Sequence, residues 1–276
     1  NPILSTDDFE KLLAVNQGKQ KTQVQSILYQ MDTDNPNTLQ QALEALFKEA
    51  EAKVDSGVSI LVLSDRNRSE GQLAIPILLA VAGLHNYLVK QGKGSLASIV
   101  ADTAEVCEVH HCAMLIGYGA SGIHPYLAYS TLVAYGLEDK AENYRKACEK
   151  GLIKVMSRMG ISTVAGYHGA QLFEAVGISA AVCDQYFAGT ASRIGGLSLP
   201  QIEAEYVARY QDAYGPQASD YLPSGGSFQY KADGEHHLFN PKTIYNFQKA
   251  VRAGDYQLYK TYANAMNEET LATPTT

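Results

Sequence analysis

The sequence is poor in cysteine and has no cysteine arrangement typical of a metal site. Four cysteines occur among the 276 residues, and they form neither a C-x-x-C pair nor a spacing that binds zinc. Thiols that are neither paired nor metal-bound are typical of a reducing compartment. We therefore expect a cytoplasmic protein with reduced cysteines and no metal site.

The sequence also lacks a long apolar run, an excess of positive charge and a signal peptide. The longest apolar run, Leu73 to Leu84, contains Pro76 and is too short to span a bilayer. The net charge of -7 argues against a nucleic-acid partner, because such binding requires a basic stripe. The start at Asn1 and Pro2 suggests a piece cut from a longer protein. We expect neither a membrane nor a nucleic acid among the partners.

The sequence does contain short apolar runs that alternate with helical stripes. Hydrophobic residues make up 46% of the chain, which is enough for a sizeable core. The alternation predicts an α/β fold in which a mostly parallel β-sheet is flanked by helices. The expected strands are residues 24–31, 58–63, 96–101, 161–165 and 180–183.

Composition divides the chain into three parts. Residues 1–214 carry the alternation and are expected to form the α/β domain. Residues 215–239 are polar and rich in Gly, Pro and Ser, which predicts a linker loop. Residues 240–276 begin with Asn240 and Pro241, a helix-capping pair, and predict a helical C-terminal extension.

Several glycine-rich segments stand out. The stretch 151–177 predicts a helix that Gly160 ends, a short strand, a glycine turn and a second helix. A glycine turn that opens a helix can bind a phosphate through free backbone N–H groups. The glycines match neither the dinucleotide nor the P-loop pattern, so tight packing of strand against helix is the alternative. Two further segments, residues 117–122 and 187–196, are predicted to be loops.

Polar side chains follow the buried strand at 58–63. Ser64, Asp65 and Arg66 stand at its carboxyl end, where open α/β sheets bind ligands. An Asp–Arg pair at this position can hold a carboxylate or a phosphate. It can equally be an ion pair that pins a loop.

Two adjacent histidines lie further along the chain. His110 and His111 point about 100° apart on a helix, so they cannot easily share one metal ion. A zinc site that uses Glu108 and Cys112 is one interpretation. The other is a helix start with one buried and one exposed imidazole.

Several motifs together resemble one family. They are S-D-R at 64–66 with IPILLA at 75–80, HHCAMLIGYGASGIHPYLA at 110–128, KVMSRMGIST at 154–163, GAQLFEAVG at 169–177, F-x-G-x-x-S-R-I-G at 187–195 and HLFNP at 237–241. In this order they are similar to the central domain of glutamate synthase, in its large subunit or its single-chain ferredoxin-dependent form. The resemblance covers nearly the whole chain.

The resemblance implies a part of an enzyme. In that family a glutaminase domain comes first, and an FMN-binding barrel with a 3Fe–4S cluster follows, with ammonia passing between them. The central domain is a non-catalytic connector, so this chain is expected to have no catalytic, cofactor-binding or metal residue of its own. The resemblance implies a cytoplasmic location, or the chloroplast stroma for a plastid enzyme, and it does not decide between ferredoxin and NADPH as electron donor.

Polar residues in or beside the glycine turns are the candidates for contacts with the neighbouring domains. We expect Arg66, Arg68, His168 and Arg193 at such an interface, because loops on a rigid scaffold present contacts and arginine can bridge several acceptors. The alternative is that Arg66 and Arg193 pin their own loops. The chain departs from the family at His168, where arginine is common, and at His124, where asparagine is usual.

A second class of function stays open beside the connector. The chain can be an autonomous α/β enzyme or ligand-binding module that uses Asp65, Arg66, His110, His111 and the glycine turns. No nucleophile, base and orienting group stand at a recognisable spacing in the sequence.

Overall fold

The protein divides into two units, Asn1–Tyr210 and Gln211–Thr276. A computed structural model describes residues 1–17, 20–32, 34–216, 218, 221, 225–226 and 229–272, without the side chains of residues 17 and 269–272. Parts of the predicted linker and the last four residues therefore lie outside the described residues. No helix in the described part is long and apolar enough to cross a membrane.

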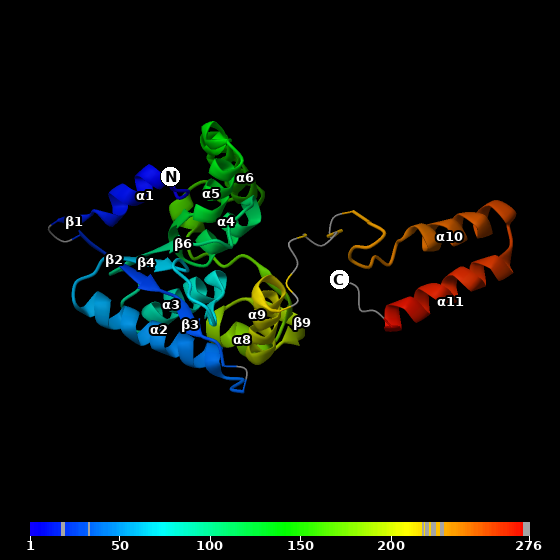
Figure 1. Cartoon of the computed structure of the whole chain (residues 1–276), viewed down its shortest axis with the longest axis horizontal. Coiled ribbons are helices and arrows are strands. Elements are labelled where there is room, and N and C mark those ends of the chain that lie inside the picture. The colour runs from blue at the N-terminus through cyan, green and yellow to red at the C-terminus, as the bar shows by residue number, and fades with distance from the viewer. Residues whose placement is uncertain are drawn as a thin grey trace. The chain divides into compact units, whose positions relative to one another are not determined.

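A five-stranded sheet organises the first unit (Figure 1). Its order is β1-β2-β4-β6-β7, formed by β1 (Asn16–Gln17), β2 (Gln20–Ser26), β4 (Ile60–Ser64), β6 (Ser98–Asp102) and β7 (Ala120–His124). Strands β2, β4, β6 and β7 are parallel, and β1 pairs antiparallel with β2. The predicted α/β fold with a mostly parallel sheet is confirmed.

Helices connect the parallel strands and cover the sheet. They are α2 (Thr38–Asp55), α3 (Ile77–Lys90) and α4 (Val109–Gly117). The other elements of the first unit are α1 (Thr6–Leu13), β3 (Leu28–Gln30), β5 (Gln72–Ala74), α5 (Tyr126–Ala134), the 3-10 turn η1 (Glu138–Lys140), α6 (Ala141–Arg158), α7 (Val164–Tyr167), β8 (Glu174–Ile178), α8 (Ala180–Tyr186), β9 (Ala191–Leu197) and α9 (Leu199–Tyr214), which crosses the unit boundary.

The two faces of the sheet belong to two hydrophobic clusters, because successive side chains of a strand point to opposite faces. Leu61 and Leu63 of β4 belong to the main core together with residues of α2, α3 and α4. Val62, between them, packs with Val100 of β6 and Phe9 of α1 on the opposite face. Burial of each large aliphatic side chain contributes about 1.5–3 kcal/mol, so the helices are held mainly by this core.

The N-terminal segment runs parallel to β7, the last strand of the sheet. Ser5 caps α1, because its hydroxyl accepts a hydrogen bond from the backbone N–H of Asp8 at 3.1 Å. Ile3 forms a bridge with Ile123 of β7. This pairing places Phe9 of α1 against the carboxyl end of β7.

Strand β7 lies in a segment that the sequence predicts to be a loop. The loop prediction for residues 117–122 was wrong, since Ala120–His124 pairs in parallel with β6. Gly119 immediately before it has φ of 113°, and a Cβ there would lie 2.4 Å from the His85 ring. Glycine at position 119 therefore lets the backbone pass close to the His85 ring at the start of β7.

The expected strand at 161–165 is absent from the structure. Gly160 does end α6, as predicted, and has φ of 73°. Thr163 then caps the short helix α7, because its hydroxyl accepts from the N–H of Gly166 at 3.2 Å. Only residues 159–163 separate α6 from α7, and the C-terminal cap of α6 and the N-cap of α7 occupy both ends of this segment, so local capping overrides the β-branched composition.

The expected strand at 180–183 is helical. Ser179 caps α8 with its hydroxyl, which accepts from the N–H of Val182 at 3.4 Å. Helix α8 then buries Val182 and Tyr186, which lie one turn apart. The apolar run that predicted a buried strand is the buried face of a helix.

A separate two-stranded parallel sheet replaces a helix and a loop expected from the sequence. Strand β8 lies where a helical stripe over 172–176 was predicted, and β9 lies within the predicted loop 187–196. Gly196 has φ of 141°, and a Cβ there would lie 2.1 Å from the backbone of Gly177. Glycine thus permits two strand backbones to approach closely at this pair.

The second unit contains a pair of helices, α10 (Pro241–Ala253) and α11 (Tyr256–Ala272). Asn240 caps α10 in a capping box with Thr243, and Gly254 ends it in the left-handed conformation. Rings of Phe247 and Tyr262 meet between the two helices at 5.2 Å. The predicted helical C-terminal extension is confirmed.

Candidate functional site

Three neighbouring parallel strands, β4, β6 and β7, end in polar residues that are register partners across the sheet. Ser64 of β4 is paired with Asp102 of β6, and Asp102 is paired with His124 of β7. All three side chains are buried. The carboxyl edge of a parallel sheet is where α/β proteins bind ligands, so we define these residues with Asp65 and Arg66 as the sheet-edge cluster.

Asp102 is the hub of the sheet-edge cluster. Its Oδ2 accepts from the Ser64 hydroxyl at 2.7 Å and from Arg66 Nε at 2.8 Å. Its Oδ1 lies 2.8 Å from His124 Nδ1, which therefore carries the donated proton. Burial works to raise the pKa of Asp102, but the hydrogen bonds from His124, Arg66 and Ser64 outweigh it and hold that pKa below 3.8.

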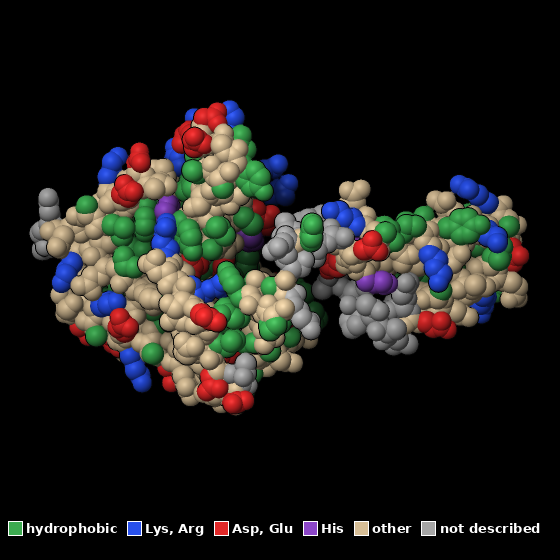
Figure 2. Space-filling view, viewed as in Figure 1, with side chains coloured by type: hydrophobic (Ala, Val, Ile, Leu, Met, Phe, Trp, Pro, Cys, Tyr) green, Lys and Arg blue, Asp and Glu red, His purple; other side chains and the backbone are tan. Residues whose placement is uncertain are grey.

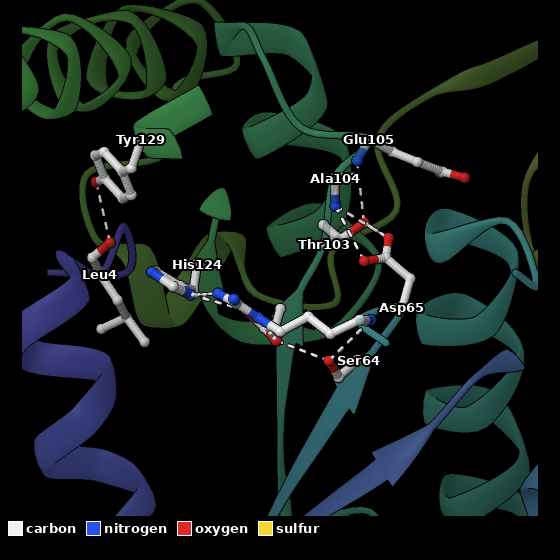
Figure 3. Close-up of polar contacts among 10 residues, drawn as sticks. Leu4, Ser64, Asp65, Thr103, Ala104, Glu105, His124 and Tyr129 are labelled. Carbon is white, nitrogen blue, oxygen red and sulfur yellow. Dashed lines mark hydrogen bonds and ion pairs between the residues drawn. The ribbon is translucent and has the colours of Figure 1, made fainter. Parts of the chain in front are cut away.

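Asp65 ties the end of β4 to the loop after β6 (Figure 3). Its carboxylate accepts from the Thr103 hydroxyl at 2.6 Å and from the N–H of Ala104 at 3.0 Å. The Thr103 hydroxyl in turn accepts from the N–H of Glu105 at 3.1 Å. Asp65 and Arg66 are adjacent in sequence, yet they have different partners and pin different elements.

Arg66 is held over the first turn of α5. Its guanidinium carbon lies 3.9 Å from the centre of the Tyr126 ring, which is a cation–π contact. Burial, followed by the charge of Asp65, raises the pKa of Tyr126. The next residue, Asn67, has φ of 60°, a conformation that asparagine tolerates better than most residues. The chain thereby leaves the cluster in a sharp turn.

His124 has one engaged and one unpartnered nitrogen. Its ring stacks on Phe9 at 4.2 Å between centroids and an interplanar angle of 13°. Its Nε2 is buried, and no hydrogen-bond partner for it lies among the residues that the structure describes. Beside it the Tyr129 hydroxyl donates to the carbonyl of Leu4 at 3.0 Å (Figure 3). An unpaired buried nitrogen costs about 1–3 kcal/mol, so the stacking and the Asp102 contact must offset it.

The order of the groups decides what chemistry the cluster can perform. In a nucleophilic triad a histidine stands between the hydroxyl and the carboxylate. Here the carboxylate of Asp102 stands between Ser64 and His124, so the serine hydroxyl donates to an ionised carboxylate, which is a much weaker base than an imidazole. His124 is only 1% exposed. The arrangement braces the sheet edge and does not activate a nucleophile.

The sequence-predicted interface residues occupy three places. Arg66 and Arg68 leave β4 on the same loop, and Arg68 lies 5.4 Å from the centre of the Tyr210 ring. His168 Nε2 lies 2.9 Å from the carbonyl of Gly119 and 3.3 Å from the Ser121 hydroxyl at the start of β7. Arg193 of β9 has its Nε 3.3 Å from Glu174 Oε1 of β8, where it is exposed.

The two adjacent histidines do not belong to any metal-binding group among the described residues. Neither His110 nor His111 is buried, so the expectation of one buried imidazole was wrong. In the described part of the chain, no group of three or more His, Cys, Asp or Glu side chains is placed to hold a metal ion. Cys112 is buried, whereas Cys107 is exposed.

Sequence reasoning missed His124 and Phe9 as members of this region. The glycines at 117–122 predict a loop, so their local pattern gives no sign that His124 ends a strand. The signal that identifies it is the repeat of strand and helix, since β7 follows α4 as β6 follows α3. No sequence pattern identifies Phe9 as a neighbour of His124, because only the path of the N-terminal segment brings it to the sheet.

Comparison with known proteins places the chain in a family. The family described as "Glutamate synthase central domain" matches residues 1–179. This chain belongs to the glutamate synthase central domain family. The matched residues contain the whole five-stranded sheet and the sheet-edge cluster.

Curated relatives of this glutamate synthase domain match nearly all of it. The NADPH glutamate synthase large chain of Bacillus subtilis (strain 168) is 44% identical over 97% of this chain and 18% of its own. Ferredoxin-dependent glutamate synthase 2 of Synechocystis sp. is 38% identical over 94% of this chain and 18% of its own. The chloroplastic ferredoxin-dependent enzyme of Oryza sativa subsp. japonica is 37% identical over 95% and 17%. The chain thus spans less than a fifth of the length of these relatives.

Proposed function

We propose that this chain is the non-catalytic connecting domain of a glutamate synthase. In this proposal it joins a glutaminase domain to an FMN-binding synthase domain of the same parent chain, in glutamate biosynthesis and ammonia assimilation. The observation that carries the proposal is the match over 94–97% of this chain but only 18% of two relatives. The remaining length of such a protein is free to hold the catalytic domains.

The sheet-edge cluster supports a structural role. Asp102 is engaged by Ser64, Arg66 and His124, and Asp65 is engaged by the loop after β6. A site that binds substrate keeps convergent polar groups available to it. Here these groups fix strands and loops to one another, which suits a rigid spacer between domains.

Exposed apolar side chains support contacts with other domains. On the β8–β9 sheet, which also carries the Glu174–Arg193 pair, Val176 is 74% exposed and Ile194 is 75% exposed. In the second unit, hydrophobic side chains also reach the surface of the helix pair (Figure 2). They include Ile244, Tyr245, Phe247 and Val251 of α10. Contiguous exposed apolar side chains mark interaction surfaces.

The four proposed interface residues differ in how they are engaged within the chain. Arg66 binds Asp102 and covers Tyr126, and His168 contacts the start of β7. Arg193 is 77% exposed, and its one partner here, Glu174, is itself exposed. An exposed pair of this kind contributes little to stability, so Arg193 is the residue best supported for a contact with another domain.

The cofactors of the parent enzyme are assigned elsewhere in this proposal. A 3Fe–4S cluster requires several cysteine thiolates on one site. In the described part of the chain, no three cysteine, histidine or acidic side chains come together to hold a metal ion, so its cysteines do not fit a cluster. FMN and the cluster accordingly belong to the synthase domain, and the location is cytoplasmic, or stromal for a plastid parent.

Assays of the purified chain test the proposal. We expect no glutamine hydrolysis, no glutamate formation and no stoichiometric FMN, whereas a longer protein that contains the chain shows all three under the same conditions. Stoichiometric flavin on the chain, or turnover that survives repurification, contradicts the connector role and favours an autonomous enzyme.

A further inference from the structure

One thiol of the protein is exposed and lies beside an imidazole. Cys107, in the loop between β6 and α4, is exposed, whereas the other three cysteines are buried. Its Sγ lies 3.6 Å from His111 Nδ1. The loop position and the helix together bring residues four apart in sequence into contact.

The surroundings of His111 fix which nitrogen faces the thiol as an acceptor. The backbone N–H of Cys107 donates to Nδ1 at 3.3 Å, so Nδ1 carries the lone pair and the proton of the neutral ring is on Nε2. Nε2 lies 3.6 Å from Glu108 Oε1. Glu108 therefore favours the imidazolium that forms when Nδ1 accepts a proton, as the carboxylate does in a triad.

A cavity adjoins this Cys107–His111–Glu108 group. It has a volume of about 320 Å³, and its lining includes His111, Glu105, Tyr206 and Arg209 together with apolar Leu78 and Met114. This size lies within the range of small-molecule sites. His111 thus faces the thiol of Cys107 and lines the cavity.

The cavity lining contains one carboxylate, that of Glu105, and one guanidinium, that of Arg209, which can bind a carboxylate of a ligand. Glu105 is already engaged, since it accepts from the N–H of Ile77 at 3.1 Å and from the Tyr206 hydroxyl at 3.0 Å. Burial raises the pKa of Glu105, against these hydrogen bonds. The guanidinium carbon of Arg209 lies 5.2 Å from the centre of the Tyr206 ring.

We propose that Cys107 is a site of thiol–disulfide exchange with small, carboxylate-bearing disulfides, with His111 as the base and the cavity holding the attached group. The Cys107 thiol gives its proton to His111 Nδ1, and the thiolate attacks one sulfur of the disulfide. A new bond forms between Cys107 Sγ and that sulfur, and the S–S bond of the reagent breaks. The leaving thiolate takes the proton from His111. Cys107 is oxidised and the released thiol is reduced, so no other redox partner is needed.

Rates of modification of the full chain test this site. The probes are oxidised glutathione, which is anionic, cystamine, which is a cationic disulfide, and iodoacetamide, which is neutral. Mass spectrometry of the unsubstituted chain should locate one adduct on Cys107, and Cys107→Ser should abolish it. His111→Gln should slow all three probes about tenfold or more, because the base is lost.

Substitution of Arg209 separates the cavity from the base. Arg209→Gln should slow oxidised glutathione about threefold relative to cystamine and leave iodoacetamide unchanged, because only the anionic probe uses that charge. Circular dichroism verifies that each variant is folded before rates are compared. Adducts on the buried cysteines at the same rate, or equal rates in His111→Gln and the unsubstituted chain, would overturn the proposal. If Arg209→Gln keeps the ratio of the oxidised glutathione rate to the cystamine rate seen in the unsubstituted chain, the proposal that the cavity holds the attached group is wrong.

Discussion

Substitution of Asp102 by asparagine tests the brace at the sheet edge. Asparagine has the same shape but offers one acceptor oxygen and no charge, so it cannot serve Ser64, Arg66 and His124 together. Each hydrogen bond to a charged group contributes about 1.5–3 kcal/mol. The Arg66 side chain is 40% exposed, so water replaces much of its bond to Asp102, and the loss of this bond contributes less than the loss of a buried one. We expect Asp102→Asn to lower the free energy of unfolding by about 2–4 kcal/mol at neutral pH.

Urea unfolding of the chain measures this loss. Asp55→Asn is the matched control, because Asp55 also accepts from a cation, Lys93, but is exposed. The control should cost less than about 1 kcal/mol. If Asp102→Asn costs no more than Asp55→Asn, the cluster does not brace the sheet and its buried charges need another explanation.

The loss should depend on pH in one direction. The pKa of Asp102 is depressed in the folded chain from 3.8, so its stabilisation is complete above 3.8 and is lost as the pH falls through the folded value. The gap in unfolding free energy between the unsubstituted chain and Asp102→Asn should therefore narrow in acid. A gap that widens below pH 3.8 contradicts the assignment.

Two further predictions concern residues that the fold uses in unusual ways. His124→Ala removes the ring from Phe9 and the donor from Asp102 and should cost about 2–4 kcal/mol, whereas His124→Asn keeps a donor and should cost less in the same urea assay. Equal losses of unfolding free energy in His124→Ala and His124→Asn would show that His124 stabilises the fold through its ring stacking and not through its hydrogen bond to Asp102. Gly196→Ala should destabilise by about 3 kcal/mol or more, because its Cβ meets the backbone of Gly177, whereas Gly195→Ala, which has open space, should cost about 1 kcal/mol. Equal thermal shifts for the two would refute the close approach of β8 and β9.

The sequence identified those parts of the fold in which local pattern and burial agree. The predicted strands 58–63 and 96–101 overlap β4 and β6, because a continuous apolar run buried on both faces has few other structures. The predicted strand 24–31 instead divides between β2, which is largely polar, and β3. At Thr163 a single hydroxyl caps a helix and outweighs β-branched composition, and at Ser179 a hydroxyl caps a helix where a short apolar run predicted a strand. The contact between Asp102 and His124 could not be predicted, because the glycines before His124 obscure strand β7. The contact between Phe9 and His124 could not be predicted either, because it depends on tertiary packing alone.

The coupling of two reactions in a longer protein tests the connector role most directly. Val176→Asp with Ile194→Asp changes two exposed side chains of the β8–β9 sheet, and Val133→Asp on α5, 62% exposed, is the matched control. The measurement is glutamate formed per glutamine hydrolysed. We predict that this ratio falls in the double variant and not in the control, while urea unfolding of the isolated chain is unchanged in both. A ratio that stays at its unsubstituted value in the double variant contradicts the proposal that this surface joins the catalytic domains.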